Sequence, residues 1–200
     1  MKKKIDGLNL QIPKEVYDPA EDSFLLTENV QINLNNKVLE IGSGSGYVSI
    51  FLAKKFPKAE YFCIDINFYA ANITNKNAIS NNVNILTICS DLFNSINTHT
   101  MRQPIFDVII FNSPYLPVSE KGILEKAWSG GVDGLEIVNN FVLNFTKFLK
   151  KEGKCYLVVS SKTDTQLLEE ILLKHKLIFE IKDSVKEGNE RIILYLLSIN

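Results

Sequence analysis

The sequence contains few of the residues that cross-link small proteins or bind metals, since only 3 of its 200 residues are cysteine and only 2 are histidine. Cys63, Cys89 and Cys155 stand far apart among apolar neighbours, which is typical of reduced, buried thiols in cytoplasmic proteins. A disulfide framework or a zinc site would need closely spaced cysteines or histidines. The sequence therefore predicts no disulfide and no metal centre.

An excess of one charge is also missing. The 22 basic and 23 acidic residues give a formal net charge of -1, so the chain has no general attraction for a nucleic-acid backbone. No run approaches the roughly 18 uninterrupted apolar residues of a membrane span, and Ile5 to Gln11 is too polar for the core of a signal peptide. We therefore predict a cytoplasmic protein without membrane contact, and a solvated terminus at Met1 to Lys4.

What is present is an alternation of strand-like and helix-like segments. Short apolar runs rich in β-branched and aromatic residues predict buried strands at Val38–Ile41, Tyr61–Ile66, Ile85–Cys89, Phe106–Phe111 and Cys155–Ser160. Helical spacing of apolar residues predicts helices at Tyr47–Phe56, Phe68–Asn81 and Gly134–Leu149. This alternation is typical of the α/β class, in which crossover helices cover both faces of a parallel sheet.

The last third of the chain ends the predicted sheet. After a helix at Thr165–His175, the strand-like runs Leu177–Val185 and Arg191–Ile199 predict a closing hairpin. Because no internal repeat or linker divides the chain, we expect one domain over residues 1–200.

A further helix is expected before the first strand. Asp18 can cap a helix at Ala20–Val30, with Pro19 in its first turn and Glu21 completing a capping box. This helix can lie across the ligand edge of the sheet, so we expect segment 1–36 to cover a ligand site.

A glycine-rich loop follows the first predicted strand and opens the first predicted crossover helix. It reads Glu40-Ile41-Gly42-Ser43-Gly44-Ser45-Gly46 and lies where an open α/β sheet binds ligands. Glycines let the backbone approach a ligand, and the free N–H groups of a helix start favour a carboxylate or a phosphate. The same residues also fit a tight strand-to-helix turn that binds nothing.

Acidic residues follow the next two predicted strands. Asp65 stands about 20 residues beyond the loop, where a carboxylate can accept both hydroxyls of a ribose. Asp91 can take the exocyclic amine of adenine while Leu92 packs on the ring, although an acid there also fits a turn. Together these residues favour a cofactor that contains adenosine.

S-adenosylmethionine and NAD both contain adenosine. The loop has the spacing GxGxG, whereas the dinucleotide fingerprint is GxGxxG. The carboxylate of Glu40 directly before the glycines suits a cationic sulfonium and its amino group better than a pyrophosphate. The loop therefore favours S-adenosylmethionine.

The residues that choose the chemistry follow the fourth predicted strand. Asn112-Ser113-Pro114-Tyr115 resembles the Asn-Pro-Pro-Tyr motif of methyltransferases that modify planar nitrogens, which include the HemK-type release-factor glutamine methyltransferases, DNA adenine methyltransferases and some rRNA guanine methyltransferases. The usual first proline is replaced by Ser113, while Pro114 still biases that residue toward extended conformations. A β-turn without catalytic function is the alternative interpretation.

The chemistry explains these residue types. An amide nitrogen shares its lone pair with the carbonyl, so it is a poor nucleophile until acceptors hold its hydrogens. We expect the Asn112 side-chain oxygen and the Ser113 carbonyl to be those acceptors, and Tyr115 to stack on the flat amide. The motif then works by orientation and electrostatics, without an obvious general base.

Three segments resemble the eukaryotic and archaeal release-factor glutamine methyltransferases of the HemK family. They are Val16–Leu26, Ala127–Gly134 and Glu190–Ile193, so the resemblance covers nearly the whole chain. It implies a Rossmann-like class I methyltransferase fold with a seven-stranded, mostly parallel sheet, one antiparallel strand and helices on both faces. It also implies S-adenosyl-L-methionine as the cofactor, with these contact residues: Ser23, Glu40, Gly42, Gly44, Asp65, Asp91, Leu92 and Asn112.

The resemblance also implies a substrate and a partner. The substrate is the glutamine of the Gly-Gly-Gln motif in a class I translation release factor, and the partner is a small zinc-binding activator protein that forms a heterodimer. The strand Ile85–Cys89 is the candidate edge for pairing with that partner, unless the chain's own loops protect it. Trp128, beside Gly130 and Gly131, either lines the substrate groove or anchors a loop in the core.

Other functions stay open. They are N-methylation of adenine or guanine in nucleic acid, lysine methylation in proteins, and a catalytically idle cofactor-binding subunit of a complex. The near-neutral charge argues against nucleic acid, since such proteins usually carry a basic footprint. Ser113 is the feature that supports an idle subunit.

Overall fold

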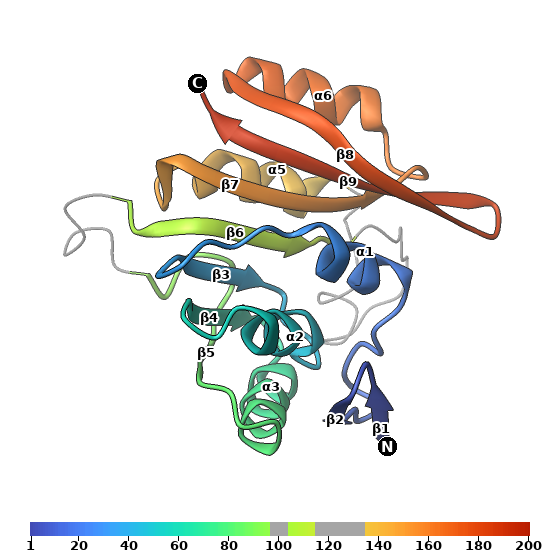
Figure 1. Ribbon diagram of the computed structural model, residues 1–200. Helices are drawn as coiled ribbons and strands as arrows, with labels where there is room; N and C mark the ends of the chain where they lie inside the picture. Colours follow the sequence, from blue (N-terminus) through green and yellow to red (C-terminus); the bar gives the residue numbers. More distant parts are fainter. Residues whose placement is uncertain (97–103, 115–134) are drawn as a thin grey trace.

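The computed structural model describes residues 1–96, 104–114 and 135–200. Within these ranges a seven-stranded sheet has the order β5-β4-β3-β6-β7-β9-β8, and β1 and β2 form a separate two-stranded sheet (Figure 1). The strands are β1 (Lys2–Ile5), β2 (Leu8–Gln11), β3 (Lys37–Ile41), β4 (Glu60–Asp65), β5 (Ile85–Cys89), β6 (Phe106–Asn112), β7 (Leu149–Ser160), β8 (Leu177–Glu187) and β9 (Glu190–Ile199). The helices are α1 (Glu21–Asn29), α2 (Tyr47–Lys55), α3 (Phe68–Ser80), α5 (Glu136–Phe145) and α6 (Thr165–Lys174).

The directions of the strands confirm the predicted fold class. Strands β5, β4, β3, β6 and β7 pair in parallel, and β9 runs antiparallel between β7 and β8. The sheet is therefore mostly parallel with one antiparallel strand. Helices α1, α2 and α3 lie on one face, and α5 and α6 lie on the other (Figure 1).

Residues 108–111 of the central strand β6 show why a buried strand is apolar on both faces. Successive strand residues point to opposite faces, so Val108 and Ile110 join the core on the side of α1 and α2, while Ile109 and Phe111 join the core under α5 and α6. All four are buried. A strand covered on both faces needs apolar residues at every position.

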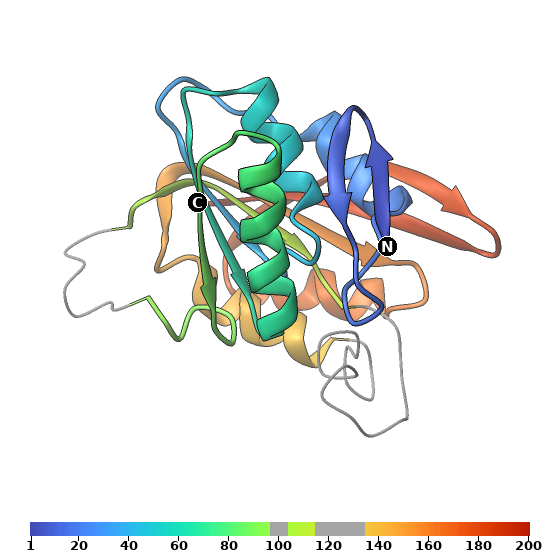
Figure 2. The same ribbon diagram turned by 90° about the horizontal axis from the view of Figure 1, so that it is seen from below.

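Lys2 and Lys4 at the N-terminus are exposed, as predicted, but residues 2–5 also form strand β1, which was not predicted. Asp6 and Gly7 connect β1 to β2 with φ values of +47° and +79°, the left-handed conformations of a two-residue hairpin turn. Leu8 and Leu10 alternate with polar residues along β2 and are buried. The hairpin lies beside α2 and α3 (Figure 2).

The predicted capping box before α1 is wrong. The N-cap residue is Ala20, which makes no side-chain capping bond, and in the first turn the N–H of Ser23 bonds to Asp22 Oδ1 instead. Asp18 instead accepts a hydrogen bond from the Lys3 ammonium of β1. The hairpin that the prediction missed thus provides the partner that keeps Asp18 away from the helix.

The boundary between α5 and β7 also differs from the prediction. The predicted helix continues to Leu149, but α5 ends at Phe145 and Leu149 begins β7. The N–H of Phe148 bonds to the carbonyl of Phe145 in the turn between them, and Leu149 pairs with Phe106 of β6. An apolar residue at helical spacing is here the first buried residue of a strand.

The three cysteines are free, as predicted, but they are not all buried. Cys63 and Cys155 are buried, whereas Cys89 is exposed on the edge strand β5. In the part of the chain that the structure describes, no helix is both long and apolar enough to cross a membrane. The same part holds no group of three or more His, Cys, Asp or Glu side chains placed for a metal ion.

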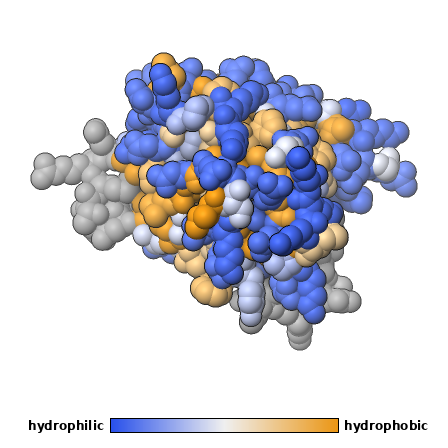
Figure 3. Space-filling model, turned by 60° about the horizontal axis from the view of Figure 1, so that its bottom comes forward, coloured by the Kyte–Doolittle hydropathy of each residue, from blue (hydrophilic) through white to orange (hydrophobic). Residues whose placement is uncertain are grey.

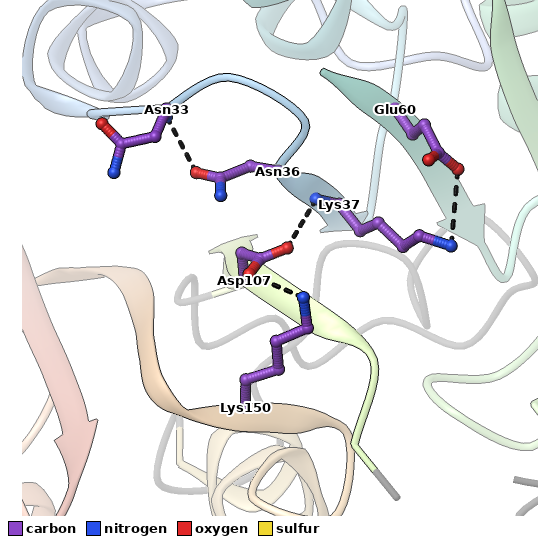
Figure 4. Close-up of polar contacts among 6 residues, drawn as sticks. All are labelled: Asn33, Asn36, Lys37, Glu60, Asp107 and Lys150. Carbon is purple, nitrogen blue, oxygen red and sulfur yellow. Dashed lines mark hydrogen bonds and ion pairs between the residues drawn. The ribbon is translucent and has the colours of Figure 1, made fainter. Parts of the chain in front are cut away.

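A polar cluster joins four strands at their amino ends (Figure 4). Asp107 of β6 accepts the backbone N–H of Lys37 at 2.8 Å and the ammonium of Lys150 at 2.8 Å. The ammonium of Lys37 lies 3.5 Å from the carboxylate of Glu60. These contacts align the strand starts and leave the carboxyl ends of the parallel strands for the site described next.

Candidate active site

A cavity of about 280 Å³ lies at the carboxyl ends of β3, β4, β5 and β6. This is the edge where open α/β sheets bind ligands. Its described lining residues are Glu15, Val16, Tyr17, Asp22, Ile41, Gly42, Gly44, Ile64, Asp65, Ile66, Asn67, Ala70, Ser90, Asp91, Leu92, Phe111, Asn112, Ser113, Pro114, Ile137, Glu187 and Glu190. The glycine loop and the first three residues of the predicted catalytic motif therefore meet in one cavity.

The glycine loop has the conformation that its sequence requires. Gly42, Gly44 and Gly46 have φ values of +70°, +56° and +81°, which residues with a Cβ rarely adopt. A methyl group on Gly42 would lie 3.8 Å from the carbonyl oxygen of Asn112. The loop thus runs directly beside the predicted catalytic motif.

Asp65 ends β4 and holds the glycine loop. Its Oδ2 accepts the N–H of Gly44 at 2.8 Å, and its Oδ1 accepts the N–H of Asn67 at 2.8 Å. Burial raises the pKa of this carboxyl, against the lowering effect of these two N–H groups. Each oxygen keeps a further lone pair, so both remain able to accept hydroxyls from a ligand in the cavity.

Leu92 and Asp91 form the wall beyond β5. Leu92 has a φ of +44°, which a bulky side chain adopts only when the surrounding structure enforces it. Its side chain and Ile66 provide apolar surface in the cavity. Such a wall suits the flat face of a base, and the predicted packing of Leu92 on adenine stays a prediction.

Glu40 lies beneath the loop, and the cavity lining does not include it. Its Oε2 accepts hydrogen bonds from the Ser49 hydroxyl and from the Ser49 N–H at 3.1 Å, near the start of α2. Burial raises the pKa of this carboxyl to about 7, although the bonds from Ser49 lower it. The predicted contact between Glu40 and the cofactor stays a prediction.

Asn112 is the last residue of β6 and lines the cavity. Its side-chain Oδ1 is buried and has no hydrogen-bond partner among the described residues. A buried acceptor without a partner costs free energy, roughly 1 to 3 kcal/mol. Such an atom is positioned to accept a hydrogen from a bound group.

Ser113 is fixed where the related motif carries proline. Its hydroxyl donates to the carbonyl of Val158 in β7 at 2.6 Å, and its N–H donates to the same oxygen at 3.3 Å. The side chain is buried. The substitution is therefore accommodated by bonds that restrain the backbone.

The first turn of α1 presents Asp22 to the cavity, although the prediction chose its neighbour Ser23. Asp22 is buried and accepts the Tyr17 hydroxyl at 2.8 Å and the Ser23 hydroxyl at 3.0 Å. Ser23 is buried and is not a lining residue. The acidic residue in the first helical turn was the sequence signal for this position.

The hairpin that closes the sheet contributes two lining residues that the sequence analysis did not assign. Glu187 and Glu190 flank the β8–β9 turn. Glu190 accepts the Ser160 hydroxyl at 2.6 Å and lies 3.2 Å from the Lys162 ammonium. Glu187 and Glu190 are far along the chain from the other lining residues, and the sequence alone does not show that β9 lies next to β7 in the sheet.

The lining is strongly acidic. Six of the described lining residues are carboxylates, namely Glu15, Asp22, Asp65, Asp91, Glu187 and Glu190, and none of them is lysine, arginine or histidine. Such a lining favours cations and repels anions.

Two predicted site features lie outside the described residues. They are Tyr115, the last residue of the motif, and the segment that holds Trp128, Gly130 and Gly131. Their predicted roles in stacking and in lining a groove stay predictions.

Comparison with known proteins agrees with this geometry. Residues 17–183 match the family model of the methyltransferase small domain. The chain is 44% identical over 164 residues to a putative protein N5-glutamine methyltransferase of Methanocaldococcus jannaschii, with 80% of each protein covered. It is 35% identical over 168 residues to methyltransferase HEMK2 of Homo sapiens, with 79% of this chain and 78% of that protein covered.

A solved structure shares the fold. It is Mtq2 of E. cuniculi in the Mtq2-Trm112 complex, which is responsible for methylation of the eRF1 translation termination factor. The TM-score is 0.72 at 21% identity, with 93% of this chain and 99% of that chain covered. Since the family model spans most of the sequence and both sequence relatives align with more than two thirds of it, the chain belongs to the methyltransferase small domain family, in its HemK-type branch.

Proposed function

We propose that this protein transfers a methyl group from S-adenosyl-L-methionine to the side-chain nitrogen of the glutamine in the Gly-Gly-Gln motif of a class I translation release factor. The observation that carries this proposal is the buried, unpartnered Oδ1 of Asn112 beside the glycine loop. An acceptor in that place can take one amide hydrogen. The glutamine methyltransferase relative at 44% identity supports the choice of an amide as the acceptor of the methyl group.

The residues of the cavity fit the methyl donor. Asp65 would hold the ribose hydroxyls, and Leu92 and Ile66 would contact the adenine. Gly42 and Gly44 leave space for close approach of the ligand to the backbone. The acidic lining suits the positive charge of the sulfonium and of the amino group. Glu40 would act indirectly, by holding the start of α2.

Each protein group then has a defined task. When bound, S-adenosylmethionine supplies an electrophilic methyl group. Asn112 Oδ1 and the carbonyl of Ser113 would accept the two amide hydrogens and turn the nitrogen lone pair toward that methyl carbon. Methyl transfer would form the nitrogen–carbon bond while the carbon–sulfur bond of the donor breaks, and the methylated nitrogen would release one proton to solvent. The two acceptors bind more strongly as positive charge develops on the nitrogen.

Methylation of nucleic acid is disfavoured by the cavity. A DNA or RNA substrate would bring phosphates close to the base that is modified, and the six carboxylates of the lining would repel them. An idle subunit is disfavoured by Ser113, since the hydroxyl of this residue compensates for the missing proline by bonding to Val158.

A partner protein on β5 is the second part of the proposal. β5 is an edge strand of the sheet, and large apolar side chains are 56% to 67% exposed on and beside it, namely Phe68, Tyr69, Ile79 and Leu86. Hydrophobic side chains appear among hydrophilic ones on the face that carries α3 and β5 (Figure 3). A small zinc-binding activator that adds a strand to this edge would cover this surface.

One assay tests the function. The protein, with and without the activator, is incubated with radiolabelled S-adenosylmethionine and with purified release factor, total RNA or total DNA. We expect label on the release factor, and none on a factor whose Gly-Gly-Gln glutamine is replaced by alanine.

Each other result contradicts a part of the proposal. Label on nucleic acid would overturn the protein substrate. Label that persists in the glutamine-to-alanine factor would indicate another residue, such as lysine. No label anywhere, under conditions in which the donor binds, would indicate an idle subunit. The proposed substrate places the protein in the cytoplasm, where translation occurs.

A further inference from the structure

Asn77 of α3 and Asn81, the C-cap residue of the same helix, pair with the backbone of β2 in the same way. Asn77 accepts the N–H of Gln11 at 2.8 Å and donates to the carbonyl of Gln11 at 2.9 Å. Asn81 accepts the N–H of Asn9 at 2.9 Å and donates to the carbonyl of Asn9 at 2.9 Å. Each side-chain amide therefore makes the two hydrogen bonds that the backbone of a neighbouring strand would make. Both are buried, so these bonds are shielded from water.

Asn77 and Asn81 differ in the acceptor of their second side-chain N–H. Asn77 donates it to the carbonyl of Ser45, in the glycine loop, at 2.8 Å. Asn81 donates it to the carbonyl of Asn77, within α3, at 2.8 Å. Both side chains thus make three hydrogen bonds, but of the two only Asn77 connects the hairpin to the glycine loop.

A second residue of α3 supports the same loop. The hydroxyl of Thr74 lies 3.1 Å from the carbonyl of Gly44 and 3.1 Å from the hydroxyl of Ser43. Thr74 and Asn77 therefore contact the carbonyls of Gly44 and Ser45, two successive residues of the glycine loop. Because a peptide group is planar, a fixed carbonyl also fixes the direction of the N–H on the other side of the bond.

The hairpin is continuous with one wall of the cavity. After β2, the chain passes through Glu15, Val16 and Tyr17, which line the cavity. At the start of α3, the side chain of Asn67 donates to the carbonyl of Glu15 at 2.9 Å. Helix α3 thus holds both this wall and the glycine loop.

We propose that Asn77 is a positioning residue of the cofactor site, through which the β1–β2 hairpin stabilises the binding conformation of the glycine loop. This inference rests on the proposed binding of S-adenosylmethionine at that loop. It assigns to residues 2–11 a role in binding affinity that does not require them to touch the ligand.

The test compares Asn77→Ala with Asn81→Ala in the full chain. Calorimetry gives the Kd of S-adenosylhomocysteine, circular dichroism gives the unfolding midpoint without ligand, and steady-state kinetics give the KM of the release factor. Both variants lose three hydrogen bonds, so we expect similar decreases in midpoint. We expect the Kd to rise about tenfold in Asn77→Ala and less than about twofold in Asn81→Ala, with the KM of the release factor unchanged.

A second pair of variants changes the residues of the hairpin that bond to Asn77 and Asn81. Gln11→Pro removes the N–H that Asn77 accepts, and Asn9→Pro removes the N–H that Asn81 accepts. The side chains of Gln11 and Asn9 do not contact the glycine loop in the described contacts. A higher Kd of S-adenosylhomocysteine in Gln11→Pro, but not in Asn9→Pro, would therefore support an effect of the hairpin on the loop.

The outcomes separate this inference from the proposed function. Equal changes of Kd within a pair, or no change in either member, overturn the role of Asn77. If wild-type protein does not bind S-adenosylhomocysteine, the proposed cofactor site itself is wrong. If Asn77→Ala does not fold, Gln11→Pro and Asn9→Pro are compared instead. A higher Kd in Gln11→Pro alone supports the role of Asn77, and equal Kd values overturn it.

Discussion

The hydroxyl of Ser113 and the carbonyl of Val158 lie 2.6 Å apart, which joins the end of β6 to β7 at the proposed catalytic motif. A proline at this position would restrict the backbone through its ring. Ser113 restrains it through two hydrogen bonds to one oxygen. The departure from the usual motif therefore replaces one source of rigidity by another.

Removal of this bond should reduce turnover. We expect Ser113→Ala to lower the free energy of unfolding by about 1 kcal/mol and kcat by about tenfold, because the Ser113 carbonyl is held less firmly, while the Kd of S-adenosylhomocysteine stays within about twofold. Ser113→Pro is the control, and it should keep kcat within about threefold of wild type, since the ring restores restraint. Equal losses of kcat in both variants would contradict this explanation.

Asn112→Ala should separate activity from stability. In the part of the chain that the structure describes, the Oδ1 of Asn112 has no partner, so its removal should change the free energy of unfolding by less than about 1 kcal/mol. Loss of the acceptor for the substrate amide should lower kcat by about a hundredfold or more. Thermal unfolding and the labelling assay measure the two effects. Normal transfer by this variant would show that the amide is held elsewhere.

The buried Glu40 should make stability depend on pH. Its pKa is raised from 4.5 to about 7 in the folded protein, chiefly by burial, so the folded chain binds more protons than the unfolded chain between these values. The free energy of unfolding should therefore fall as pH rises through this window, by an amount of the order of 3 kcal/mol. Below pH 4.5 and above pH 7 this contribution should be constant.

Glu40→Gln is the matched variant for that measurement. Glutamine keeps an acceptor for Ser49 but does not titrate, so the decrease between pH 4.5 and pH 7 should become smaller in denaturant unfolding. Part of the slope should remain, because burial also raises the pKa of Asp65. An unchanged slope would show that Glu40 is already ionised throughout this range.

Gly46 should tolerate no side chain. A Cβ at this position would lie 2.9 Å from Thr74 Cγ2 and 3.2 Å from Thr74 Cα, and φ is +81°. We expect Gly46→Ala to lower the free energy of unfolding by about 2 to 4 kcal/mol, the sum of left-handed strain and overpacking. Gly188→Ala has positive φ but open space around it, so it should cost only about 1 kcal/mol. Equal losses would mean that α3 moves away from the loop.

The two edges of the sheet allow a controlled test of the activator. Leu86 on β5 is 56% exposed and Ile178 on β8 is 55% exposed, so arginine at either position should change stability little. Leu86→Arg should weaken binding of the activator at least tenfold in calorimetry, because it places a charge in the proposed apolar interface. Ile178→Arg should bind it normally. The reverse result would move the interface to β8.

The central strands and the glycine loop were predictable because their signals are local. Apart from Asp107, the run Phe106–Phe111 is apolar and buried, which is typical of a strand covered on both faces. The left-handed glycines of the loop likewise follow from residue type alone. These features depend little on what the rest of the chain does.

The features that were missed depend on contacts between distant residues. Glu187 and Glu190 reach the cavity only because β9 inserts between β7 and β8. The bond from Lys3 to Asp18 cannot be anticipated before the N-terminal hairpin is known. That hairpin had a local signal, since Asp6-Gly7 between alternating apolar residues is typical of a two-residue turn.

The cluster around Asp107 has a practical consequence for the measurements above. It ties the strand starts together at the end of the sheet remote from the cavity, about 15 Å away along five strand residues. A fluorophore or surface tether near this end, for example on Lys58→Cys in a Cys89→Ser background, would leave the cavity unobstructed. The protein could then be immobilised in one orientation, with ligands and partners supplied from solution.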